Sequence, residues 1–289
     1  MPRRPARPGP PEAGETLPSR GLWGLAVRRP AGLFLALAFG WTSCWCLGLR
    51  LLGLEVAPGS PATHLPALAG PGIAAAVILG LGGGRAALAD LARRCLRLPV
   101  RPAWVPVAIL ASPAVALAVF AGIEGRLPAA AELAAFPGLP EGLGLLPVLL
   151  LVLLLNGFGE EIGWRGFLFD RLAPAGPFRA ALLVGLAWLA WHAPLFAVHA
   201  GMQKMIGPAL LGWAASLVAA SFLLGHLHLA AGRSIAAPAL LHALFNLATA
   251  PPALAGAPAA AASALVIAWG AALGLASGRA ALARERGSS

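Results

Sequence analysis

The chain has 289 residues, of which 59% are hydrophobic and only 11% are charged. Soluble domains carry about 25% charged residues, so this composition excludes an ordinary soluble domain and predicts an all-α, polytopic helix bundle in a membrane. The formal net charge of +10 does not indicate a nucleic-acid partner, because the basic residues sit between apolar runs and form no patch interleaved with aromatic residues.

The chain divides into two short basic ends and a long apolar middle. Residues 1–30 are rich in proline and arginine and predict a disordered cytosolic tail. Residues 31–278 predict the transmembrane domain, and residues 279–289 a short basic C-terminal tail. The domain contains eight apolar segments, each near the roughly 20 residues that cross a bilayer. Their predicted limits are 31–53, 64–84, 102–122, 143–169, 179–198, 207–229, 234–250 and 254–277.

The basic residues also predict the orientation. If the N-terminus is cytosolic, 18 of the 21 basic residues fall on the cytosolic side, and only Arg50, Arg126 and Lys204 fall on the other. Cytosolic loops carry an excess of Lys and Arg. We therefore predict a multi-pass protein of the plasma or inner membrane, surrounded by the lipid bilayer, with both termini in the cytosol. The arginine-rich stretch 85–101 predicts either a polar linker or an amphipathic surface helix.

The fourth apolar segment contains Glu160, Glu161 and Arg165. One ionisable side chain at the middle of a membrane helix costs roughly 2.5–3.5 kcal/mol on insertion scales. Glu161 and Arg165 are four residues apart, so they predict an ion pair on one helix face, with Glu160 turned toward another neighbour. Small residues surround the three and predict close approach of other helices: Gly157, Gly159, Gly163 and Gly166. The alternative is a purely structural ion pair.

Two later segments carry polar residues at a similar depth. His192 lies in the fifth segment, and His242 and Asn246 lie four residues apart in the seventh. Counted from the nearest cytosolic arginine, these groups and Glu160 lie about 14–20 Å from the cytosolic face. Convergence at one depth predicts a site. By contrast, His226 and His228 fall at the cytosolic end of the sixth segment, where we expect them to reach the interface.

These residues form three motifs that occur in chain order. They are Glu160-Glu161-x-x-x-Arg165, Trp188-x-x-x-His192 and His242-x-x-x-Asn246. The set resembles the CPBP family of CAAX prenyl proteases and bacteriocin-processing proteins, also called Abi proteins, over about residues 140–250. The family's second motif is written FxxxH, so tryptophan replaces phenylalanine at position 188. The family fold also has eight membrane spans.

The resemblance implies an intramembrane endopeptidase that hydrolyses a peptide bond in a membrane protein or peptide. It implies Glu160 as the general base and His192 as the group that helps to polarise the attacking water. It further implies that His242 and Asn246 stabilise the oxyanion. Glu161 and Arg165 would brace the helix. The sequence does not identify the substrate.

A cofactor and two other function classes stay open at this point. Glu160, His192 and His242 could bind Zn²⁺, although the chain has no HExxH motif and Asn246 is a poor zinc ligand. A transporter or proton relay also uses intramembrane Glu and His clusters. Transporters usually show an internal repeat, and none is visible here. The remaining alternative is a non-catalytic scaffold or immunity factor.

Overall fold

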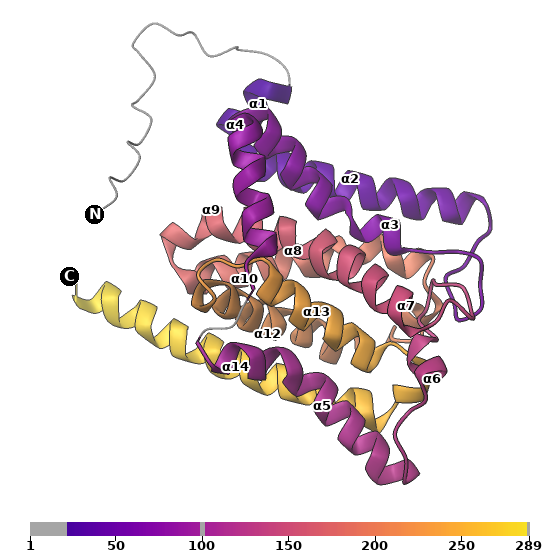
Figure 1. Cartoon of the computed structure of the whole chain (residues 1–289). Helices are drawn as coiled ribbons and strands as arrows, with labels where there is room; N and C mark the ends of the chain where they lie inside the picture. The colour runs from indigo at the N-terminus through magenta and orange to yellow at the C-terminus, as the bar shows by residue number, and fades with distance from the viewer. Residues whose placement is uncertain (1–21, 99–101, 288–289) are drawn as a thin grey trace, which may run out of the picture.

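The computed structural model describes residues 22–98 and 102–287 and confirms an all-α bundle (Figure 1). Apart from a single bridge between Val56 and His199, these residues contain no β-structure. Seven helical stretches are long and apolar enough to cross a membrane. They are α2 (Pro30–Leu51), α3 with α4 (Leu65–Leu68, Gly70–Leu96), α5 (Trp104–Glu124), α7 to η3 (Leu145–Ala175), α10 with η4 (Pro177–Trp191, Ala193–Ala197), α12 (Pro208–Ala230) and α14 (Ala257–Gly287).

The seventh predicted segment differs from the other seven. It forms helix α13, Ala236–Thr249, which has only 14 residues and at 1.5 Å per residue is about 21 Å long. Nine of its residues are buried, on all sides of the helix. Because α13 is enclosed by other helices, its length does not have to match the thickness of the lipid. The remaining short elements are α1 (Leu22–Arg28), α6 (Ala130–Ala134), α11 (Ala200–Gln203) and η5 (Pro252–Leu254).

Both ends of the predicted domain are more helical than expected. Residues 1–21 of the predicted tail lie outside the described residues, but Leu22–Arg28 forms helix α1, so the disorder predicted for 1–30 does not extend through this part. At the other end α14 continues from the apolar segment to Gly287. Helix α1 and the last turns of α14 lie toward the same end of the bundle (Figure 1).

Helix α4 changes direction at Gly84, whose φ of +59° and ψ of −152° are not helical. Only glycine adopts this backbone region readily. The two halves of α4 meet at an angle there, and the second half runs across the other helices (Figure 1). The arginine-rich stretch is therefore helical up to Leu96, as one of the two predictions for 85–101 proposed, while residues 99–101 lie outside the described part.

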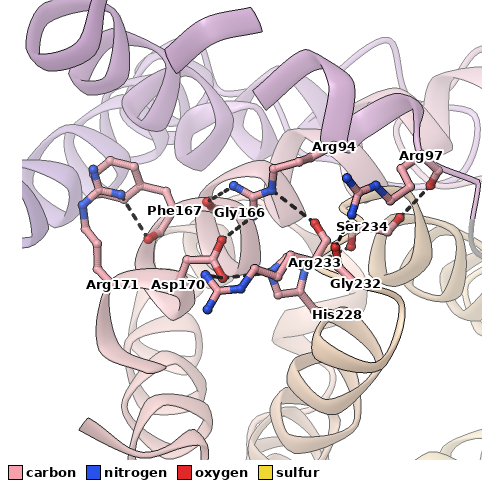
Figure 2. A network of polar contacts seen from close by, with 10 residues as sticks. All are labelled: Arg94, Arg97, Gly166, Phe167, Asp170, Arg171, His228, Gly232, Arg233 and Ser234. Atoms are coloured by element: carbon pink, nitrogen blue, oxygen red, sulfur yellow. Dashed lines mark hydrogen bonds and ion pairs between the residues drawn. The ribbon is translucent and has the colours of Figure 1, made fainter. Parts of the chain in front are cut away.

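A polar network holds the second half of α4 to the helix that carries the first motif (Figure 2). Its centre is Asp170, the first residue of α9 (Asp170–Leu172), which forms ion pairs with Arg94 and Arg233 and contacts Nε2 of His228 at 3.0 Å. Arg94 also donates to the carbonyl of Gly166 at 3.2 Å. We call Arg94, Asp170, His228 and Arg233 the Asp170 clasp.

The clasp corrects the expectation for His228. Its side chain is fully buried, and Nδ1 lies 2.9 Å from the carbonyl oxygen of Ser234. The prediction failed because it used only the position of His228 near a helix end. Asp170, which lies 58 residues earlier in the chain, supplies the partner that removes His228 from the interface.

Glycines let the neighbouring helices approach the first motif closely, as predicted. A Cβ at Gly157 would lie 2.7 Å from the carbonyl oxygen of Ala239 in α13, and one at Gly163 would lie 2.6 Å from the carbonyl oxygen of Pro71 in α4. Both separations are too short for a side chain. The two glycines therefore bring α13 and α4 against the motif from different sides.

Candidate active site

The first motif lies on a helix that changes its winding on both sides of the two glutamates. The short α8, Gly159–Gly163, carries Glu160 and Glu161, and it is preceded by the π-helical η1 (Leu153–Phe158) and followed by the π-helical η2 (Trp164–Phe169). π-Helical turns are rare and frequently occur at functional sites. Nothing in the local sequence predicted them. They set the direction in which the two glutamates and Arg165 project.

The predicted pair of Glu161 and Arg165 is present and completely buried. Arg165 Nη1 donates to Glu161 Oε1 at 2.7 Å, and both side chains are 0% exposed. The same Oε1 atom lies 2.9 Å from Nδ1 of His242, which comes from α13. Glu161 thus connects the first motif to the last one. A carboxylate that accepts from two donors is strongly held in place.

Glu160 faces a different set of neighbours, as the sequence predicted. Its side chain is 2% exposed, and Oε2 accepts a 2.7 Å hydrogen bond from the indole N–H of Trp188 in α10. The other oxygen, Oε1, lies 4.0 Å from Nε2 of His242, which is too far for a direct hydrogen bond. Among the described residues no donor therefore lies within hydrogen-bond distance of Oε1, and Glu160 lines a cavity.

His192 follows α10 directly, and a contact of Nδ1 with the backbone fixes the orientation of its ring. Its Nδ1 lies 2.7 Å from the carbonyl oxygen of Trp188. Because only an N–H can bond to a carbonyl, Nδ1 carries the proton and Nε2 of the neutral ring is an acceptor. The ring also packs edge to face against Trp191 and Trp213, with centroids 5.0 and 5.3 Å away.

A cavity of about 480 Å³ joins the residues of all three motifs. Glu160, His192, His242 and Asn246 all line it, so the predicted convergence of the four is present in the fold. Asn246 is half-buried one helical turn after His242. Glu161 and Arg165 are packed behind the cavity wall and are not among the residues that line it.

Further polar residues line this cavity and were not predicted, among them Asn156, His64 and His199. Asn156, one turn before Glu160, has a buried Oδ1 without a hydrogen-bond partner among the described residues. Its position inside an apolar helix was a signal that sequence reasoning could have used. His64 and His199 also line the cavity and lie beside each other, with ring centroids 4.8 Å apart. Burial lowers the pKa of His64 to about 3, with a further contribution from His199.

The side chains do not fit a metal centre as they are placed. Nδ1 of His242 faces Glu161, and Nδ1 of His192 faces a backbone carbonyl. The remaining His242 nitrogen and Glu160 Oε1 are 4.0 Å apart, while Oε2 accepts from an indole. Within residues 22–98 and 102–287, no three His, Cys, Asp or Glu side chains form a group that could hold a metal ion. We therefore assign no step to a metal.

The region that carries the three motifs resembles a known protein family. Residues 142–248 match the family described as Type II CAAX prenyl endopeptidase Rce1-like. This segment is similar to the Rce1-like family. The matched range contains all three motifs and agrees with the resemblance found over residues 140–250.

A similar stretch occurs in CAAX prenyl protease 2 of Methanococcus maripaludis, which is 45% identical over 62 residues. The alignment covers 21% of this chain and 22% of the relative. The chain thus spans less than a quarter of that relative's length in the match.

Proposed function

We propose that this protein is an intramembrane endopeptidase that cleaves a membrane protein or peptide with a water activated by Glu160 and His192. The observation that carries the proposal is the meeting of Glu160, His192, His242 and Asn246 around one cavity inside an apolar bundle. The Rce1-like match over the same residues and the name of the archaeal relative support it.

The attacking water binds between Glu160 and His192. Oε1 of Glu160 has no donor, so it accepts one proton of the water, while Oε2 stays bound to Trp188. Nε2 of His192 is an acceptor because Nδ1 is engaged with a backbone carbonyl. Two acceptors orient the lone pairs of the water toward the peptide carbonyl carbon. General-base assistance of this kind contributes about 10²–10⁴ in rate.

His242 and Asn246 stabilise the negative charge that develops on the carbonyl oxygen. With Nδ1 donating to Glu161, His242 offers a second N–H at Nε2 only as the imidazolium. The two carboxylates Glu160 and Glu161 then balance Arg165 and His242, so the buried set is neutral. The Asn246 amide supplies the second donor. Donors prepared in a low-dielectric cavity stabilise the transition state more than they would in water.

The proton that Glu160 takes from water completes the reaction. Oxygen attack forms the C–O bond of the tetrahedral intermediate, and collapse of that intermediate breaks the C–N bond. Protonated Glu160 donates to the departing amine, which restores the carboxylate. The new acid and amine leave the cavity. Glu161 and Arg165 take no part in the transfer and hold His242 and α8 in position.

Glu160→Gln tests this proposal. The amide keeps the shape and the acceptor for Trp188 but cannot take a proton, so we expect a folded protein without activity. Membrane fractions from cells that express wild type or Glu160→Gln are compared by proteomics for new peptide ends. Purified protein in nanodiscs is then tested on a farnesylated CAAX peptide and on the same peptide without the farnesyl group. Equal cleavage by wild type and variant would refute the role of Glu160.

We also propose that both termini face the cytosol of the plasma or inner membrane. Helix α1 and the end of α14 lie toward one end of the bundle, and the Asp170 clasp gathers Arg94 and Arg233. A cysteine introduced at Glu124 should react with a membrane-impermeant reagent in intact cells, whereas one at Arg3 should not. The reverse labelling pattern would invert the topology.

A further inference from the structure

Trp188 contacts residues of all three motifs. Its indole N–H donates to Glu160 at 2.7 Å, and its carbonyl oxygen accepts from His192 at 2.7 Å. The guanidinium carbon of Arg165 lies 4.8 Å from the centre of its ring, and the ring of His242 packs edge to face at 5.3 Å. The side chain is 3% exposed.

The hydrogen bond to Glu160 depends on the departure from the FxxxH pattern. Phenylalanine has no polar hydrogen, so it would supply the ring contacts but no donor to the carboxylate. A glutamate in an apolar bundle needs donors to stabilise its ionised form. Among the described residues, the Trp188 indole is the donor that forms a hydrogen bond to the Glu160 carboxylate.

We propose that Trp188 is a positioning residue that selects which oxygen of Glu160 acts as the base. Its N–H holds Oε2 in place, so Oε1 is directed toward His242 and the cavity. There Oε1 accepts a proton from the attacking water. Without this bond the carboxylate can rotate and present either oxygen. The proposal rests on the proposed endopeptidase function and adds to it a role for Trp188 in orienting the Glu160 carboxylate.

The test removes the N–H while it keeps the ring. Trp188→Phe and a protein with benzothienylalanine at position 188, which has the two-ring shape without an N–H, are compared with wild type. We expect kcat to fall about ten- to hundredfold, the range of a hydrogen bond to a charged group, with KM nearly unchanged. The acid limb of the kcat profile should move to higher pH, because the N–H favours the ionised carboxylate.

Trp191→Phe is the matched control. Trp191 lies three residues later, is also buried, and donates its N–H to the backbone carbonyl of Ala38 at 3.3 Å. This variant loses a buried indole bond without touching Glu160, so its acid limb should not move. Normal kcat in benzothienylalanine protein, or an equal pH shift in Trp191→Phe, would overturn the proposal.

A measurement without substrate separates this proposal from the proposed function. Infrared titration in nanodiscs follows the C=O band of protonated Glu160, which is assigned by its loss in Glu160→Gln. We expect this band to appear at higher pH in Trp188→Phe than in wild type. Identical titrations would overturn the Trp188 contact, whatever the activity. A third outcome is that the band shifts between wild type and Trp188→Phe but wild type cleaves none of the peptides. This outcome would overturn the proposed function and the catalytic part of this inference, while the contact between Trp188 and Glu160 would stand.

Discussion

The Asp170 clasp and the candidate active site are both networks of charged groups on the same helix, but they differ in how completely they are paired. The clasp is only partly buried, since the Arg233 side chain is 53% exposed. In the clasp, Oδ1 of Asp170 meets His228 and Arg233, Oδ2 meets Arg94, and the second nitrogen of His228 meets a carbonyl. In the site, Glu161 Oε2, Arg165 Nε and Nη2, and Asn156 Oδ1 have no partner among the described residues.

This difference separates a structural network from one that can do chemistry. A buried polar group without a partner costs about 1–3 kcal/mol. Of these atoms, Asn156 Oδ1 belongs to a residue that lines the cavity, where water or substrate can supply the missing partner. Both networks border a cavity: the site lines one of about 480 Å³, and Arg94 and Asp170 of the clasp line a separate one of about 210 Å³. The clasp fixes the end of the motif helix, and the site keeps atoms ready for water and substrate.

The largest expected effect on stability is in the ion pair behind the site. Arg165→Met removes the cation between Glu161 and the ring of Trp188 and leaves a buried carboxylate, at a cost of about 3–5 kcal/mol. We expect the purified variant to unfold at a much lower temperature or to be recovered in low yield. The double variant Glu161→Gln/Arg165→Met should recover part of the loss in a double-mutant cycle. Wild-type stability of Arg165→Met would show that the pair is not structural.

Asn246→Ala should affect turnover rather than folding. A donor that acts mainly in the transition state costs roughly 10²–10³ in kcat when it is lost, or about 2.7–4 kcal/mol. Peptide affinity should change little, because the ground-state carbonyl bears less charge. Single-turnover cleavage and peptide binding in nanodiscs measure the two separately. A variant that loses affinity first would instead favour the transporter, which contacts its ligand in the ground state.

The sequence predicted the placement of the motif side chains better than it predicted the contacts around them. The pair of Glu161 and Arg165 follows from helical spacing alone, and membrane burial of Glu160, His192 and His242 follows from their place in apolar runs. Such inferences are local. They need only the helix period and the cost of burying charge.

The features that were missed depend on contacts between distant segments. Arg94 and Asp170 are 76 residues apart, so no periodicity reveals their pairing, and His228 was misplaced at the interface for that reason. The bond from Trp188 to Glu160 spans 28 residues and needs the relative rotation of two helices. The length of α13 was overestimated because its apolar composition does not distinguish a span from a helix enclosed by others.

Asp170→Asn tests whether the Asp170 clasp, the more completely paired of the two networks, acts on stability alone. The amide keeps the shape but lacks the charge that Arg94, Arg233 and His228 share, and we expect a stability loss of about 1.5–3 kcal/mol, typical of hydrogen bonds to charged groups. The kcat of the folded protein should stay near the wild-type value, because no residue of the clasp lines the cavity of the candidate site. Asp90→Asn is the control, since Asp90 and Arg93 form an exposed pair at 3.4 Å. A large loss of kcat in Asp170→Asn would connect the clasp to catalysis.

The smallest effect is expected at an ion pair outside the spans, between Arg126 and Glu132. Arg126 Nη1 and Nη2 contact the two carboxylate oxygens of Glu132 at 2.6 and 2.8 Å, and the Ala129 N–H donates to Oε2 at 2.7 Å. The hydrogen bonds from Arg126, and then from Ala129, lower the pKa of Glu132 to about 2. Water surrounds this pair, so the two charges are screened and their pairing adds little to stability.

Glu132→Gln should therefore lower the melting temperature only slightly at pH 7. A lowered pKa in the folded state means that the pair stabilises the fold above the ordinary glutamate value of about 4.3. The small difference between wild type and variant should shrink as the pH falls from about 4.3 toward about 2. Melting curves across this range measure it. A loss at pH 7 as large as that of Arg165→Met would show that burial is not what makes the inner pair costly to break.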